Sequence, residues 1–192
     1  MPDVLVIGSG GAGLAAAIAA CDAGADVTLA TKLGVASCNT AKAQGGIQAA
    51  IADDDSVETH FEDIVRSSHD TADLVLARTL AEGGPAAIAW LAELGVDFTR
   101  EADGGLRVAR CGGATRKRLL QVGDQTGLAI AGALRAAVGE RPIEVLDNAP
   151  LVEVGPGHAV LERGGERVAL QPGAIVLAAG GCCKRVAAEL GE

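Results

Sequence analysis

Three glycines near the start of the chain, Gly8, Gly10 and Gly13, form the pattern G-x-G-x-x-G. In such a pattern the first glycine permits a tight turn, the second lets the backbone approach a pyrophosphate, and the third lets a helix pack closely on a sheet. Phosphates then bind the N–H groups at the start of that helix. The pattern therefore predicts a dinucleotide site, which also includes the intervening residues Ser9, Gly11 and Ala12.

The elements around these glycines complete a βαβ unit. Residues 4–7 are apolar and mostly β-branched, which predicts a buried parallel strand. An Ala-rich helix over 11–24 ends at a glycine stop, and a second strand follows at 26–30. A glycine-rich turn alone is common, but this order of elements favours a dinucleotide site over a merely structural turn.

Composition favours one α/β domain and excludes several function classes. The chain has 192 residues, 49% of them hydrophobic, with 27 glycines and only 2% aromatics. A formal charge of −9 argues against a nucleic-acid surface, because phosphate backbones require clustered Lys and Arg, and the only dense basic run is 116–118. The five cysteines show no C-x-x-C spacing, so we expect no zinc or iron–sulfur site and no metal ligands.

The hydrophobic stretches are too short to span a bilayer. The N-terminus enters a strand directly, without the cationic start of a signal peptide. We therefore expect a cytoplasmic chain with no transmembrane segment.

Two features after the first helix bear on the ligand. Many dinucleotide enzymes have an acidic residue at the end of the second strand, which holds the ribose, but this chain has Thr31 and Lys32 there. A hydroxyl and a cation would then hold ribose and phosphate. The segment 37–50 is rich in small and hydrogen-bonding side chains, and Gly45-Gly46 lets backbone approach a flat polar ligand.

These features together resemble the flavoprotein family of succinate dehydrogenase, fumarate reductase and L-aspartate oxidase. The resemblance rests on the G-x-G-G-x-G turn, on Thr31-Lys32, and on Asn-Thr-Ala-x-Ala-Gln-Gly-Gly-Ile some seven residues later. In that family the Gln-Gly-Gly loop lies along the flavin of FAD. The resemblance thus implies FAD contacts by Asn39, Thr40, Ala41, Lys42, Ala43, Gln44, Gly45 and Gly46.

The middle of the chain has helical periodicity. Apolar residues recur at three- and four-residue steps from 56 to 95, and Gly83-Gly84-Pro85 predicts a break between two helices. We interpret His60 and His69 as residues on exposed helix faces or caps rather than as catalytic groups. Further on, Gly112-Gly113 resembles the family segment that approaches the flavin or the substrate.

The last third of the chain predicts strands. A short strand at 143–146 is followed by Asn148-Ala149, which resembles the family's backbone contact to the adenine end of FAD. Three short strands at 151–154, 159–163 and 166–170 predict an antiparallel meander. The apolar strand 174–181, which ends in the glycine pair Gly180-Gly181, should return to the parallel sheet, and Gly180 is a further expected FAD contact.

The predicted fold is α/β: a Rossmann-like FAD-binding domain over 1–192 with a parallel sheet, a helical insertion at about 53–100 and a three-stranded antiparallel meander. Asn39 stands where respiratory members have the histidine that is linked to FAD, so the resemblance implies non-covalent FAD. Cys111 replaces the glutamate of aspartate oxidases, which disfavours aspartate as substrate, although it is not the phenylalanine of succinate and fumarate enzymes either.

The family continues into a capping domain whose His and Arg residues bind the dicarboxylate. Because this sequence stops at Glu192, we expect no catalytic residue within it and no turnover of fumarate or succinate by the isolated chain. Whether the chain is itself an enzyme stays open. The resemblance implies a partner, either an iron–sulfur electron-transfer subunit or a second chain with the capping domain, and a location peripheral to the inner membrane through such partners.

The leading hypothesis is an FAD-binding domain of an oxidoreductase that acts on a dicarboxylate when complete. The alternatives are a non-catalytic FAD- or nucleotide-binding remnant and one half of a split enzyme. A nicotinamide-dependent reductase is disfavoured, because the Gln-Gly-Gly loop has no role there.

Overall fold

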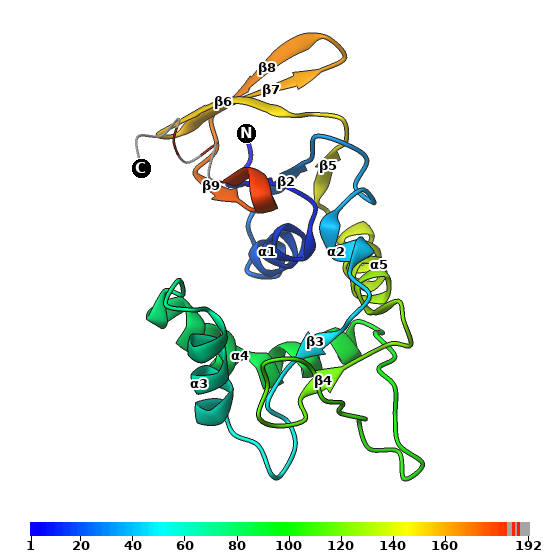
Figure 1. The fold of residues 1–192 in the computed structure, drawn as a ribbon. Coiled ribbons are helices and arrows are strands. Elements are labelled where there is room, and N and C mark those ends of the chain that lie inside the picture. Colours follow the sequence, from blue (N-terminus) through cyan, green and yellow to red (C-terminus); the bar gives the residue numbers. More distant parts are fainter. Residues whose placement is uncertain (184–185, 187, 189–192) are drawn as a thin grey trace. The chain divides into compact units, whose positions relative to one another are not determined.

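The computed structural model describes residues 1–183, 186 and 188. It divides into two compact units, one formed by Met1–Lys42 with Ile130–Glu192 and the other by Ala43–Ala129 (Figure 1). The expected helical insertion at about 53–100 remains a prediction.

A four-stranded parallel sheet forms the centre of the first unit. Its order is β5 (Glu144–Leu146), β2 (Val27–Ala30), β1 (Val4–Ile7) and β9 (Ala174–Leu177). In β1, Val4 lies opposite Val27 on one side and Ala174 on the other. The predicted return of the last strand to the parallel sheet is confirmed.

Helix α1 (Gly11–Asp22) follows β1, and its buried residues are Gly13, Leu14, Ala17 and Ile18. It ends at Asp22, two residues before the predicted stop at Gly24, where φ is +91°. Small residues on the buried face of α1 let its backbone approach the sheet closely.

The predicted meander is also present in the first unit. Strands β6 (Leu151–Gly155), β7 (His158–Arg163) and β8 (Glu166–Leu170) pair antiparallel in that order. Ala159 and Leu161 of β7 share a core cluster with Leu5 and Ile7 of β1. The meander therefore packs on the parallel sheet.

The second unit contains α3 (Val57–Ser67), α4 (Leu74–Glu93) and a two-stranded sheet of β3 (Ile47–Gln48) and β4 (Leu119–Leu120). The Ser56 hydroxyl caps α3 by accepting from the Thr59 N–H, and Asp73 caps α4 in the same way. Two short helices, α2 (Asn39–Lys42) and η1 (Gly180–Cys182), belong to the first unit. Helix α5 (Thr126–Gly139) contains residues of both units.

The predicted break at Gly83-Gly84-Pro85 is wrong, because α4 runs through it without interruption. An interior proline removes one hydrogen bond and costs about 3 kcal/mol. Ala77 and Ala81 before the proline, and Ile88 and Leu91 after it, are buried, each at most 5% exposed. Burial of large apolar side chains stabilises by about 1.5–3 kcal/mol each, so packing offsets the cost of the proline.

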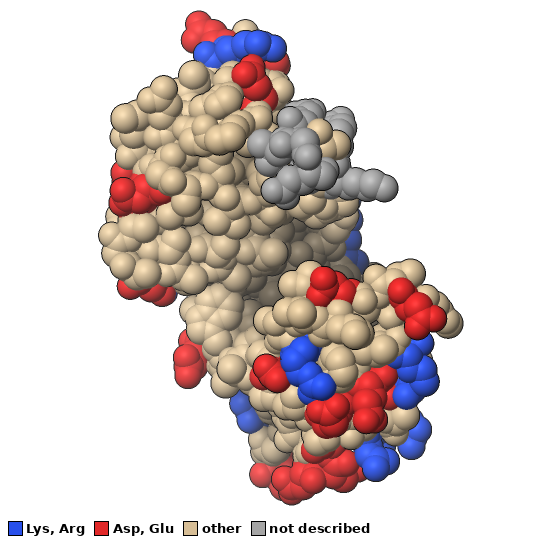
Figure 2. All heavy atoms as spheres, turned by 90° about the vertical axis from the view of Figure 1, so that its left-hand side faces the viewer, with Lys and Arg blue, Asp and Glu red and all other residues tan. Residues whose placement is uncertain are grey.

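Charged side chains of both signs gather over the part of the molecule that carries α3 and α4, where Lys and Arg lie among Asp and Glu (Figure 2). Among the described residues, no helix combines the length and the apolar character needed to cross a bilayer.

Candidate functional site

The turn between β1 and α1 brings the three glycines of the pattern together. Gly8 has a φ of +112°, and a Cβ there would overlap the carbonyl oxygen of Ala178, just after β9. A Cβ at Gly13 would overlap the carbonyl oxygen of Gly8. The fold of the chain itself therefore requires glycine at these two positions, as the pattern predicts.

Gly10 is different, because neither its conformation nor its packing requires glycine. Its φ of −74° and ψ of 177° are open to any residue. Among the described residues, the atom nearest to a Cβ at Gly10 is the Thr40 hydroxyl oxygen, at an ordinary 3.7 Å. A side chain is therefore missing at Gly10 without a reason in the chain's own packing, and this leaves room beside the backbone for a group such as a pyrophosphate.

The first turn of α1 is fixed by α2. The Thr40 hydroxyl accepts a hydrogen bond from the Gly11 N–H at 2.9 Å, across 29 positions of sequence. Gly10, the N-cap residue, offers no side chain to the helix N-terminus. Asn39 and Lys42 are exposed, and Ala41 is half-buried. The structure thus brings two expected contact segments, 8–13 and 39–42, together in one unit.

The ends of three strands meet beside this turn. The Ser9 hydroxyl donates to the Thr31 hydroxyl at 3.0 Å, and both residues are buried. The Ala149 N–H donates to the Thr31 carbonyl at 2.8 Å, and Asn148 adopts a left-handed φ of +51°. Four expected contact residues from β1, β2 and β5 or the turns after them therefore lie side by side.

Lys32 contacts the short helix that begins at Gly180. The Lys32 ammonium lies 3.6 Å from the Cys182 sulfur, in the short helix η1 that begins at Gly180. Lys32 is exposed, so its charge is accessible to an anion. Its role in holding ribose or phosphate stays a prediction.

The remaining expected contacts, Ala43–Gly46, belong to the second unit and are all exposed. We call these four residues the Gln-Gly-Gly loop. Gly46 has a φ of +135°, and a Cβ there would lie 2.5 Å from the Leu120 carbonyl oxygen. The loop backbone is therefore pressed against β4, which requires glycine at position 46.

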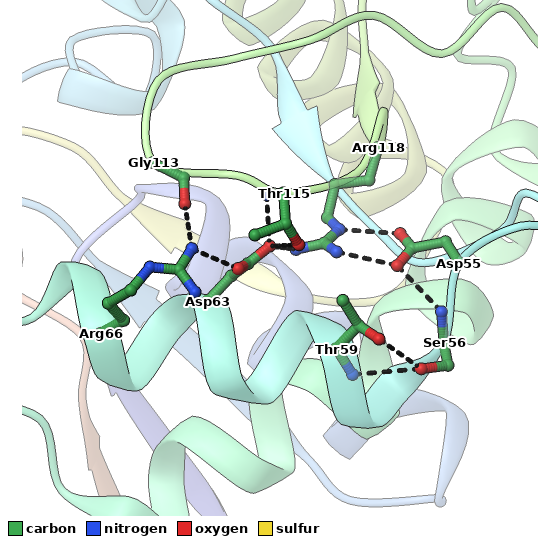
Figure 3. Close-up of polar contacts among 8 residues, drawn as sticks. All are labelled: Asp55, Ser56, Thr59, Asp63, Arg66, Gly113, Thr115 and Arg118. Carbon is green, nitrogen blue, oxygen red and sulfur yellow. Dashed lines mark hydrogen bonds and ion pairs between the residues drawn. The ribbon is translucent and has the colours of Figure 1, made fainter.

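A buried ion cluster, which the sequence does not predict, lies between α3 and the segment before β4 (Figure 3). The Asp63 carboxylate accepts from the Thr115 N–H at 2.8 Å, from the Thr115 hydroxyl at 2.9 Å and from Arg118 at 2.6 Å. Arg66 also donates to Asp63, and to the Gly113 carbonyl at 2.8 Å. The cluster therefore ties the 113–118 segment to α3.

Arg118 is the centre of this cluster, and its side chain is fully buried. Two of its nitrogens donate to the two oxygens of Asp55, each at 2.8 Å. Burial by itself raises the pKa of Asp63, but the hydrogen bonds from Thr115, Arg66 and Arg118 together hold that pKa well below its ordinary range. Asp63 therefore remains ionised at neutral pH.

His60, on the same face of α3, corrects another expectation. It is 3% exposed rather than on an open helix face, and its Nδ1 atom is buried with no partner among the described residues. Burial and the nearby charge of Arg118 lower its pKa, against the opposing effect of Asp55 and Asp63. His60 and Asp63 line a cavity of about 310 Å³ that also touches Gly112 and Gly113.

The sequence carries a weak signal for this cluster. His60, Asp63 and Ile64 are spaced as one helix face, which would have favoured burial of all three. Arg118 stands in the only dense basic run, but nothing in the sequence pairs it with α3, 55 residues earlier.

Comparison with known proteins decides the family. A family model described as FAD binding domain matches residues 3–192. The chain belongs to this family. The predicted FAD cofactor of this FAD binding domain is thereby confirmed, and the turn at Gly10 fits it.

Relatives of this FAD binding domain include two kinds of enzyme. It is 36% identical to L-aspartate oxidase of Streptomyces coelicolor over 153 residues, which cover 79% of the chain and 26% of the relative. It is also 30% identical to the fumarate reductase flavoprotein of Haemophilus influenzae over 194 residues, which cover 95% of the chain and 32% of the relative. The chain thus spans about a third or less of the length of these relatives.

Solved structures agree with the fold. The domain resembles Mycobacterium smegmatis Sdh1 in complex with UQ1, with a TM-score of 0.89 and 31% identity over 94% of this chain and 34% of that one. It also resembles E. coli quinol fumarate reductase, with a TM-score of 0.88 and 30% identity over 94% of this chain and 33% of that one. The predicted fold class is confirmed.

Proposed function

We propose that this FAD binding domain holds FAD without a covalent bond and is the flavin-binding part of an oxidoreductase that acts on a dicarboxylate. The observation that supports FAD binding is the glycine at position 10, which the packing of the chain does not require. The second part is supported by relatives named as fumarate reductases and L-aspartate oxidases, because fumarate and aspartate are both dicarboxylates.

The proposed FAD contacts come from the segments that the sequence singles out. They are Gly8, Ser9, Gly10, Gly11, Ala12, Gly13, Thr31, Lys32, Asn39, Thr40, Ala41, Lys42, Ala43, Gln44, Gly45, Gly46, Asn148, Ala149 and Gly180.

Bound FAD supplies hydride transfer between its ring and a substrate carbon. The residues of this chain bind and orient the cofactor. The Gly11 N–H donates to Thr40, which holds the first turn of α1 in place, and the N–H groups of Ala12 and Gly13 would bind the pyrophosphate. The exposed Lys32 ammonium would supply a positive charge that attracts the negative phosphates. Asn39 has an amide where a covalent link would need a ring nitrogen, so the cofactor stays exchangeable.

We assign the oxidoreductase activity to a larger assembly, because the chain matches about a third or less of the length of its relatives. The proposed partner is an iron–sulfur electron-transfer subunit or a second chain that carries a capping domain. We further propose a cytoplasmic location with contact to the inner membrane through these partners.

The test has two parts. The purified chain is first titrated with FAD, and we expect saturable binding with a flavin spectrum that differs from that of free FAD. The loaded chain is then reduced anaerobically and mixed with fumarate, alone and together with the polypeptide encoded next to it. For the chain alone, we expect fumarate to reoxidise the flavin no faster than it reoxidises free FAD. With the partner present, we expect faster reoxidation. Absence of FAD binding contradicts the first part, and no gain with any neighbouring chain favours a non-catalytic remnant.

A further inference from the structure

Two carbonyl groups of the Gln-Gly-Gly loop accept hydrogen bonds from residues that follow β4 in the sequence. The Gly127 N–H donates to the Ala43 carbonyl at 2.8 Å, and the Gln121 side-chain amide donates to the Gly45 carbonyl, also at 2.8 Å. Both bonds come from the segment that leads from β4 into α5. An exposed loop of small residues is thus given a defined backbone by two long-range hydrogen bonds.

The bond from Gln121 fixes the direction of one N–H group. The structure has no cis peptide among the described residues, so the Gly45 carbonyl and the Gly46 N–H point in opposite directions across one planar peptide. Since that carbonyl faces Gln121, the Gly46 N–H faces away from β4. Among the described residues, β3 pairs with β4 and with no other strand. The Gly46 N–H therefore lies on the side of β3 that has no neighbouring strand.

The position of Gln121 is itself secured. It follows β4 directly, and Arg118, at the other end of that strand, is anchored by Asp55 and Asp63 (Figure 3). The Ala49 N–H donates to the Arg118 carbonyl at 3.0 Å, which ties β3 to the same anchor. The Gln121 amide therefore projects from the residue after an anchored strand, and its bond to the Gly45 carbonyl sets the orientation of the Gly45–Gly46 peptide.

We propose that Gln121 is a positioning residue for FAD, which acts by turning the Gly46 N–H toward an acceptor atom of the flavin ring. This inference rests on the proposed function, in which the Gln-Gly-Gly loop contacts the flavin. Reduction adds negative charge to the ring, and hydrogen bonds to charged acceptors are stronger than those to neutral ones. A fixed Gly46 N–H therefore favours the reduced flavin.

The experiment compares the FAD-loaded wild-type chain with Gln121→Leu and Gln121→Glu, which both remove the amide donor. We expect the dissociation constant of oxidised FAD to rise several-fold and that of reduced FAD to rise about tenfold more. A tenfold difference between the two forms lowers the midpoint potential of a two-electron couple by about 30 mV. Gln125→Leu, at an exposed position four residues on, is the matched control and should leave both quantities unchanged.

Thermal unfolding of the FAD-free variants separates positioning from stability. A purely structural role would lower the unfolding midpoint and leave the potential of the bound flavin unchanged, and that result would overturn the inference. If the wild type binds FAD and the Gln121 variants match it in affinity and potential, the inference fails while the proposed function stands. A wild type that takes up no FAD overturns both.

Discussion

Arg118 Nη1 and Asp63 Oδ2 lie 2.6 Å apart in the interior of the second unit, where the two side chains are 0% and 5% exposed. Each has further partners: Asp55 for Arg118, and Thr115 and Arg66 for Asp63. Loss of the Asp63 charge leaves Arg118 paired with Asp55 alone, and it leaves buried donors of Thr115 and Arg118 without a carboxylate to bind.

Asp63→Asn should therefore destabilise the chain by about 1–3 kcal/mol. The amide nitrogen of asparagine would face donors from Thr115 and Arg118, which had bonded to a carboxylate. Urea denaturation followed by circular dichroism measures the loss. Asp70→Asn, at an exposed position, should change stability by less than about 0.5 kcal/mol. Equal effects of the two substitutions on the free energy of unfolding would show that the cluster does not stabilise the fold.

His60 should make the chain less stable in mild acid. Its pKa in the folded chain lies below the ordinary 6.5, so below that pH the unfolded chain binds the extra proton and stability falls as the pH decreases. The slope is at most about 1.4 kcal/mol per pH unit. Asp63 adds its own loss only in stronger acid, because its lowered pKa stabilises the folded chain at every pH above the ordinary 3.8.

Urea midpoints between about pH 7.5 and about pH 5.5 test the contribution of His60. His60→Gln should flatten this pH dependence, whereas His69→Gln, on the exposed residue after α3, should retain it. An unchanged slope in His60→Gln would contradict the expectation.

Gly10→Val should weaken FAD binding about a hundredfold, which corresponds to about 2.7 kcal/mol. The valine side chain would enter the space through which the pyrophosphate approaches the backbone. The fold should survive, because a Cβ at Gly10 meets Thr40 only at 3.7 Å. FAD titration of the variant is the measurement, with Gly34→Ala as the control, because a Cβ at this loop position meets no described atom within 4 Å. Wild-type affinity in Gly10→Val would show that FAD does not lie against this turn.

Acid precipitation should release all flavin from the loaded chain. Asn39 lacks the ring nitrogen that a covalent link requires, so denaturation leaves nothing to retain the cofactor. Absorbance of the supernatant and of the washed pellet measures the partition. Yellow colour in the pellet would mean that another residue is linked to FAD.

Local sequence features predicted the first unit well. The β-branched run of residues 4–7 and the glycines at 8 and 13 act through short-range sterics, so strand, turn and helix follow from a few neighbouring residues. The meander follows in the same way from alternating strands and glycine-rich turns. Its packing against β1 could not be predicted, since it depends on contacts between residues more than 150 positions apart.

In the second unit, local sequence patterns did not predict several contacts. Asp63 and His60 look like ordinary helix-surface residues until Arg118 is brought to them from 55 positions away. Pro85 lies inside α4 because tertiary packing outweighs a local rule. Gln121 has no motif at all, and its contact with Gly45 is visible only in three dimensions.

The central strand β1 has a consequence for how the protein is made. Val4 to Ile7 pair with Ala174 to Leu177, so a segment that leaves the ribosome early waits for one that is synthesised much later. At about 5–20 residues per second, this wait lasts roughly ten to thirty seconds. During that time β1 has an unpaired edge, and the turn at Gly8 lacks the Ala178 carbonyl against which it packs. The turn after β1 therefore gains its contact with Ala178 only after Ala178 has left the ribosome.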